Sequence, residues 1–279
     1  MGYDNILKNA IDNEGKTALH YAVLNNNAKI AISLILSGLC DAFVLDKEGK
    51  TALHYAVIND KTEALDKLIE YRLCDVNIPD KEGKTALHYA VINENVMVVI
   101  SLTTYGHCDV NVPDKEGKTA LQYAVINNIT DIARLLAKED NIDVNATDND
   151  GKTALHYAVI NEQVSLIKLL KGSNGSCVNV ADNDGKLPLH YAVISNNIKI
   201  AKKLQKITND IRKRDNNSKF PLQYAVNNYA MFITLITPRY TNNNAYDLED
   251  ALECFEEAKK SIKSDIAAWE GGMWTPGDD

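Results

Sequence analysis

The sequence contains no hydrophobic run long enough to cross a membrane. The longest runs, such as residues 30–36 and 96–102, extend over about seven residues, whereas a membrane-spanning helix needs about 20. The first residues also lack the basic stretch followed by an apolar stretch that directs secretion. We therefore expect a soluble protein without a signal peptide, and no membrane among its partners.

Cysteine is scarce, with five residues in a chain of 279. An odd count without a secretion signal favours a reducing compartment, so we expect a cytoplasmic protein. Cys40, Cys74 and Cys108 are equally spaced along the chain, and Ile142 and Ser176 continue the same series. Because thiol chemistry does not tolerate isoleucine or serine, we interpret these cysteines as small core residues.

An excess of positive charge is also missing, since the formal net charge is −8. The acidity is concentrated at the end: residues 241–279 contain ten acidic residues and three lysines, whereas residues 1–240 contain 28 acidic and 27 basic residues. A nearly neutral body does not attract the phosphates of DNA or RNA. We therefore expect no nucleic-acid partner.

The dominant feature that is present is an internal repeat with a period of about 34 residues. A glycine recurs at this period, followed by Lys and then by Thr-Ala-Leu-His-Tyr-Ala-Val or a close variant, and a seventh copy of the motif stands at 215–226. Modules related in this way stack and share their apolar faces. The six glycines are Gly15, Gly49, Gly83, Gly117, Gly151 and Gly185.

One copy, residues 46–79, shows the internal pattern. It begins with a polar turn in which Gly49 is expected at positive φ, and Thr51 is predicted to cap a helix over residues 52–58. The pair Asn59-Asp60 is predicted to end this helix, because Asn tolerates the left-handed region.

A second helix is predicted next, because apolar residues follow at helical spacing. These residues are Ala64, Leu65, Leu68 and Ile69. A single copy cannot bury both apolar faces, so neighbouring copies must stack to do so.

The motif Asp-x-x-Gly-x-Thr-x-Leu-His-x-Ala, followed by two short helices and Asp-Val-Asn, resembles the ankyrin repeat over about residues 12–240. The departures are small: Ala replaces the usual Pro in five copies, the period is one residue longer, Gln122 and Gln223 replace His, and Ser218 replaces the turn Gly. The resemblance implies an all-α ankyrin-repeat solenoid of seven repeats, with helix-turn-helix units and β-turn fingers. It also implies that the protein is a monomer, that it needs no cofactor and that its partner is another protein.

Three patterns that resemble chemical sites do not satisfy the requirements of those sites. Equivalent histidines in helices stacked about 8–10 Å apart cannot share a zinc ion at ligand distances of about 2 Å, and the resemblance implies that they bond the backbone of the turns. The recurring Gly-Lys-Thr lacks the earlier Gly of a phosphate loop. Residues 148–151 lack the first ligand of a calcium loop, because Ala146 stands there. We expect no metal and no catalysis.

The segments outside the repeats lead to three further expectations. Residues 1–11 are predicted to form an N-terminal capping helix, and residues 271–279 a disordered tail. Residues 241–270 are predicted to form an amphipathic acidic helix, with an apolar stripe that includes Leu248, Phe255 and Trp269. This helix is interpreted as a C-terminal cap, with a partner-binding helix or a secretion signal as alternatives.

If the resemblance holds, a partner meets the turn tips and the exposed side of the first helices. These positions repeat with little variation, so that an isoleucine row runs beside an asparagine row, rimmed by Lys and Glu or Asp. Our hypothesis is an apolar strip that holds an extended peptide or a long helix; the alternative is that recent duplication made the copies alike and the site lies elsewhere. The positions are Lys47, Glu48, Lys50, Ile58, Asn59, Lys81, Glu82, Lys84, Ile92, Asn93, Lys115, Glu116, Lys118, Ile126, Asn127, Lys152, Ile160 and Asn161.

These observations favour a non-catalytic scaffold or adaptor that binds another protein. The alternative is a type IV-secreted bacterial effector that acts in the host cell cytoplasm, because residues 249–257 resemble the acidic block near the C-terminus of some type IV secretion substrates. A non-catalytic inhibitor would use the same surface.

Overall fold

The computed structural model describes residues 9–71, 73–171, 176–208, 213–225 and 228–236, together with Glu256 and Lys260. These residues form helices joined by turns, and the only extended pairing among them is an isolated bridge between Ile11 and Thr17. The predicted all-α solenoid is confirmed. The chain divides into two compact units, Met1–Asn149 and Asp150–Asp279.

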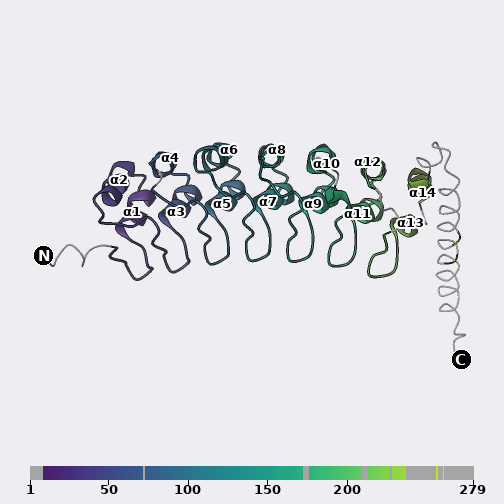
Figure 1. The fold of residues 1–279 in the computed structure, drawn as a ribbon, viewed down its shortest axis with the longest axis horizontal. Coiled ribbons are helices and arrows are strands. Elements are labelled where there is room, and N and C mark those ends of the chain that lie inside the picture. Colours follow the sequence, from purple (N-terminus) through teal and green to yellow (C-terminus); the bar gives the residue numbers. More distant parts are fainter. Residues whose placement is uncertain are drawn as a thin grey trace, which may run out of the picture. The chain divides into compact units, whose positions relative to one another are not determined.

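The first unit consists of successive helix pairs joined by turns (Figure 1). The second helix of the third pair continues as one turn of π-helix, η1. The elements are α1 (Ala18–Leu24), α2 (Ala28–Leu36), α3 (Ala52–Ile58), α4 (Thr62–Glu70), α5 (Ala86–Ile92), α6 (Val96–Ile100), η1 (Ser101–Tyr105), α7 (Ala120–Ile126) and α8 (Thr130–Leu136).

The second unit continues the same arrangement, and in both units the turns project on the side of the first helices, away from the second helices (Figure 1). A 3-10 turn, η2, precedes its second pair. The elements are α9 (Ala154–Ile160), α10 (Val164–Leu170), η2 (Ser176–Asn179), α11 (Pro188–Ile194), α12 (Ile198–Gln205), α13 (Pro221–Tyr224) and α14 (Tyr229–Ile236).

The first helices begin where the sequence predicts. Thr51 has extended backbone angles, and its hydroxyl accepts a hydrogen bond from the backbone N–H of His54 at 3.4 Å, which satisfies one of the unpaired donors at the helix start. Helices α11 and α13 lack this threonine. They begin instead with Pro188 and Pro221 at the first helical position, where the proline ring already holds the helical φ and the missing N–H has no intrahelical partner to lose.

The end of the first helices differs in detail from the prediction. Asn59 is not in the left-handed region (φ −101°); the residue with positive φ is Asp60 (φ 53°). The reason is the bonding that closes the helix, in which the N–H of Lys61 reaches back to the carbonyl of Ala56 at 2.7 Å. This closure requires a left-handed residue one place later than the pattern predicts. Glu94 and Glu162 adopt the same φ region in other copies.

The core lies between the two layers of helices and between neighbouring pairs. The four apolar residues predicted for α4 are all buried, and α3 buries Leu53, Ala56 and Val57. Helix α3 packs on α4 within its pair and on α1 and α5 in the adjacent pairs. Each fully buried leucine or isoleucine stabilises the fold by about 1.5–3 kcal/mol, so much of the stability of a pair depends on its neighbours.

The predictions for the two ends lie largely outside the described residues. This is the case for residues 1–8 of the predicted N-terminal helix, for the tail 271–279, and for all of the helix 241–270 except Glu256 and Lys260, which are helical and exposed. Residues 9–11 are not helical, and Asn9 has a φ of 58°. No helix among the described residues is long and apolar enough to span a bilayer.

Neighbouring turns contact each other through their backbones. The N–H of Lys115 donates to the carbonyl of Glu82 at 3.0 Å, and the preceding turns repeat this bond between Lys81 and Glu48. Gly83 lies against this contact with a φ of 78°, and a Cβ at this position would approach the nitrogen of Lys115 to 2.6 Å. The turn glycine is therefore required both by its φ and by the close approach of the next turn.

We predict that Gly83→Ala lowers the free energy of unfolding by about 2–4 kcal/mol, because it adds a clash with backbone to the strain of a positive φ. Gly38→Ala is the matched control, since Gly38 has a φ of 70° and nothing within 4 Å of an added Cβ. Its expected loss is only about 1 kcal/mol. Urea unfolding followed by circular dichroism measures both; equal losses would show that turn stacking adds nothing.

Candidate functional site

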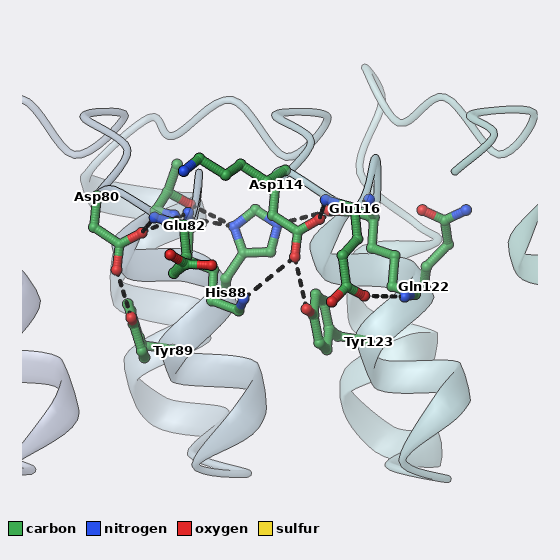
Figure 2. A network of polar contacts seen from close by, with 12 residues as sticks. Asp80, Glu82, His88, Tyr89, Asp114, Glu116, Gln122 and Tyr123 are labelled. Carbon is green, nitrogen blue, oxygen red and sulfur yellow. Dashed lines mark hydrogen bonds and ion pairs between the residues drawn. The ribbon is translucent and has the colours of Figure 1, made fainter. Parts of the chain in front are cut away.

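In the turns after the first, the aspartate that opens the turn is a buried hub of hydrogen bonds, as Figure 2 shows for Asp80 and Asp114. In Asp80, Oδ1 accepts from the backbone N–H groups of Glu82 and Lys84 at 2.8 and 2.9 Å. Its Oδ2 accepts from the hydroxyl of Tyr89 at 2.5 Å and lies 3.2 Å from the Nζ of Lys50 in the preceding turn. One carboxylate thus holds its own turn closed and joins it to the first helix and to the previous turn.

The surroundings of Asp80 and Tyr89 determine the ionisation state of each side chain. Burial by itself would raise the pKa of Asp80, but the hydrogen bonds from Tyr89, Lys84, Lys50 and Glu82 overcome it and hold the pKa below its usual range. Burial, and then the hydrogen bond to Asp80, raises the pKa of the Tyr89 phenol. The carboxylate stays charged and the phenol stays protonated, so both groups serve as structural bonds.

The repeat histidine joins each first helix to the next turn. The Nδ1 of His88 accepts from the backbone N–H of Thr85 at 3.1 Å, so this nitrogen carries no proton, and Nε2–H donates to the carbonyl of Lys118 in the next turn at 3.1 Å. Burial lowers the pKa of His88 and keeps the ring neutral. The role that the resemblance implies for the histidines, bonding to the backbone of the turns, is therefore confirmed. The other four repeat histidines make the equivalent bond to the next turn: His20, His54, His156 and His190.

Gln122 takes the histidine position in α7 and makes a modified version of this link. Its Oε1 accepts from the N–H of Thr119 at 2.7 Å, as Nδ1 does in the histidines. Its Nε2 donates to the carbonyl of Ala146 at 3.3 Å. An amide can thus replace imidazole here because both present an acceptor and a donor at opposite ends, although only imidazole changes its charge near neutral pH.

The predicted partner-binding residues fall into three groups. The first group lies at the turn tips and is exposed: Lys47, Glu48, Lys81, Glu82, Lys115 and Glu116. Because the backbones beneath these side chains are bonded from turn to turn, the tips present a regular array of alternating charge.

The second group consists of the lysines that follow the turn glycines, and their ammonium groups already have partners within the protein. Lys50 and Lys84 reach the buried Asp80 and Asp114 at 3.2 and 3.4 Å, with only 18% and 19% of their side chains exposed. Lys118 pairs with Glu116 and Lys152 with Asp150 in their own turns. These four predicted residues support the turns from beneath the tips.

The third group is the isoleucine and asparagine row at the ends of the first helices. In the first unit, Ile58 and Ile126 are half-buried and Ile92 is 37% exposed; in the second unit, Ile160 is 39% exposed. The adjacent Asn59, Asn93, Asn127 and Asn161 are all exposed.

Asn93 also has a structural task. Its Nδ2 donates to the carbonyls of Val57 and Ile58 at 3.1 and 3.2 Å, which satisfies the C-terminal end of α3 in the preceding pair.

The aspartate–tyrosine pairs were not identified from the sequence. Their signal was present, because Asp and Tyr nine residues apart recur in step with the repeat, as in Asp46–Tyr55 and Asp114–Tyr123. Sequence spacing alone does not show that a turn and a helix fold back on one another. Among the described residues, no group of three or more His, Cys, Asp or Glu side chains is arranged to hold a metal ion. The free thiols Cys40 and Cys108 are buried, as predicted for core residues, whereas Cys74 is only half-buried, so the prediction is wrong in part for this position.

Stacked helix pairs with projecting turns define a repeat solenoid, and comparison with known proteins gives the family. The family model for ankyrin repeats (three copies) matches residues 30–114, 97–182 and 163–247, and the chain belongs to the ankyrin-repeat family. Ankyrin repeats are in general protein–protein interaction modules. No curated protein matches the sequence.

Solved ankyrin-repeat structures are similar over most of the chain. The ankyrin repeat domain of Bcl-3, a member of the IkappaB protein family, is 26% identical, with a TM-score of 0.70 over 80% of this chain and 99% of that domain. EF0377, an ankyrin repeat protein, is 25% identical, with a TM-score of 0.61 over 68% of this chain and 98% of its own.

We predict that stability falls between pH 7 and pH 5 because of the neutral histidines. The pKa values of His20, His54, His88 and His190 are lowered by burial, so below about pH 6.5 the unfolded chain binds more protons than the folded one and the free energy of unfolding decreases. Each histidine contributes a slope of at most about 1.4 kcal/mol per pH unit. The aspartates, whose pKa values are also lowered, act only below about pH 4.

Urea unfolding at a series of pH values measures this slope. The variant His54→Gln/His88→Gln copies the natural Gln122 link and is expected to show a shallower slope between pH 7 and pH 5. His107→Gln is the control, because His107 is exposed and does not occupy the position at which the repeat histidines bond the next turn. A slope unchanged in the double variant would contradict the assignment.

Proposed function

We propose that this protein is a non-catalytic scaffold or adaptor that binds another protein along its turn tips and first helices. The observation that carries the proposal is the row of isoleucines Ile58, Ile92 and Ile126, which occupy the same position in α3, α5 and α7 and remain partly exposed. The preceding residue in each helix, such as Val91, is buried in the core. The row is thus the apolar edge at which the core meets solvent.

Such a row supports affinity because its geometry is already formed. The isoleucines lie on helices that are fixed by capping and by the bonds of His54, His88 and Gln122 to the following repeat, so little conformational entropy is lost when a partner covers them. Fully burying an isoleucine stabilises a contact by about 1.5–3 kcal/mol, and three partly exposed ones supply a fraction of this sum. An extended peptide or a long helix fits a row of this kind, because its side chains also recur along a line.

The turn tips support specificity. The exposed pairs Lys47–Glu48, Lys81–Glu82 and Lys115–Glu116 present both signs of charge in each turn. Charges at the rim of an interface steer association and reject mismatched partners more than they add affinity. We assign selection of the partner to these tips, and the support of the tips to the lysines beneath them.

A second candidate rests on the acidic block at residues 249–257. If it is a secretion signal, the protein is an effector that binds a host protein through the same repeats; otherwise it acts in the cytoplasm in which it is made. Removal of residues 245–279 abolishes translocation in the first case and leaves binding through the repeats intact in both.

The test of the binding surface is affinity purification from cell extract followed by mass spectrometry. The variant Ile58→Glu/Ile92→Glu/Ile126→Glu places charge at the apolar row, so partners recovered with the wild type are expected to be lost. All three positions are at least partly exposed, so the variant is expected to keep its fold, and circular dichroism is used to check this.

The matched control is Leu36→Glu/Met97→Glu/Tyr105→Glu, at large apolar residues of the same unit that are exposed on the second-helix side. This variant is expected to retain every partner. The proposal is wrong if the folded row variant recovers the same partners as the wild type, or if only the control loses them.

A further inference from the structure

The charge of the chain is divided sharply between its parts. Residues 1–149 contain 14 basic and 22 acidic residues, a balance of −8, whereas residues 150–236 contain 12 basic and six acidic residues, a balance of +6. The near neutrality of residues 1–240 is therefore a cancellation of opposite regions. The terminal residues 241–279, with −7, follow the positive region in the sequence.

The positive charge of the second unit is concentrated on α12. The exposed side of this helix and the residue that follows it carry Lys199, Lys202, Lys203 and Lys206, and we call these four residues the lysine face. Their spacing of three and four residues places them along one side of a helix, while the opposite side, with Ile200 and Leu204, is buried.

Nothing among the described residues neutralises the lysine face. None of its four lysines forms an ion pair there, and no acidic residue occurs between positions 185 and 209. Most acidic side chains of the unit's repeats already have partners elsewhere: Asp182 and Asp215 accept from Tyr191 and Tyr224.

Two more acidic side chains of this unit are paired at the turn tips, where Asp150 binds Lys152 and Asp184 binds Lys186. Like charges three and four residues apart repel one another along a helix. The lysine face is therefore a surface whose charge is uncompensated by its described surroundings.

The complement is present in the sequence after residue 246. The residues Glu249, Asp250, Glu253, Glu256 and Glu257 recur at intervals of three and four, and Glu256 is helical and exposed. The acidic row extends over nine residues and the lysine face over eight. The two rows therefore span nearly the same number of residues.

We infer that the lysine face is a docking surface and that its occupant is the acidic row of the same chain. Ten residues, 237–246, connect α14 to the acidic region, and a connection of this length reaches up to about 33 Å. Exposed ion pairs are individually weak, but a tether of this kind raises the effective concentration of the acidic row to about the millimolar range. The contact is reversible and sensitive to salt.

This contact makes α12 a second binding surface, separate from the proposed isoleucine row, since α12 is a second helix and the row lies on first helices. The inference does not depend on the proposed function of the first unit.

Zero-length carbodiimide cross-linking of the full-length protein, read by mass spectrometry, tests the contact. The reagent joins a lysine to a carboxylate only when the two touch, and the exposed Lys152–Asp150 pair, 3.2 Å apart, is the internal positive control. We expect links between the lysine face and residues 249–257. A mixture of unlabelled and ¹⁵N-labelled protein shows whether each link lies within one chain, and the yield is expected to fall as salt is raised.

Charge reversal supplies the decisive comparison. Lys199→Glu/Lys202→Glu/Lys203→Glu/Lys206→Glu is expected to expose the acidic row, measured as faster amide hydrogen exchange in residues 247–260. Replacing the five acidic residues of the acidic row by lysine in this same variant is expected to restore slow exchange and the cross-links. The matched control reverses four exposed lysines of the first unit, Lys29, Lys47, Lys81 and Lys115, and leaves exchange unchanged.

Three outcomes would overturn the inference. The first is the absence of these links in the wild type while Lys152–Asp150 is linked. The second is a set of links that join two different chains only. The third is an equal acceleration of exchange in the control variant, which would show a general effect of net charge.

Discussion

The structure depends on one kind of interaction that crosses from repeat to repeat: in five repeats a buried, neutral histidine bonds the carbonyl of a lysine in the following turn, and in α7 Gln122 bonds the carbonyl of Ala146 instead. In the middle of the first unit, His88 makes this bond to Lys118 while its other nitrogen accepts from Thr85. A ring that bonds two backbone groups in different repeats fixes their register. Loss of either bond leaves a buried polar group unpaired, which costs about 1–3 kcal/mol.

Around this bond, charged side chains hold the turns together. The aspartate at the start of a turn collects donors from its own backbone, from a tyrosine and from a lysine of the preceding turn, as Asp80 does with Tyr89 and Lys50. The side chains that most resemble a catalytic set are thus fully engaged in the framework. What remains exposed, the tips and the isoleucine row, varies little in chemistry and is rigidly spaced, which suits recognition of a partner that is itself linear.

The first helices of the first unit and helix α12 of the second unit expose different kinds of side chain. The first-helix side of the first unit offers apolar side chains bordered by mixed charge, whereas α12 offers charge of one sign, with Lys199 and Lys206 near its two ends. Apolar burial gives affinity that persists in salt, and clustered charge gives fast, reversible and salt-sensitive contacts.

The sequence by itself determined the repeat, the family, the bounds of the first helices and most of the core, because these depend on local patterns such as Thr51 before an apolar helical stretch, a pattern copied from repeat to repeat. Tertiary structure alone decided which polar residues are free. Lys47 and Lys50 lie in one turn, yet one is exposed and the other is bonded to Asp80 in the next turn. That distinction arises because stacking brings together residues far apart in the sequence, and the distance between neighbouring turns is a property of the packed backbone that no local pattern contains.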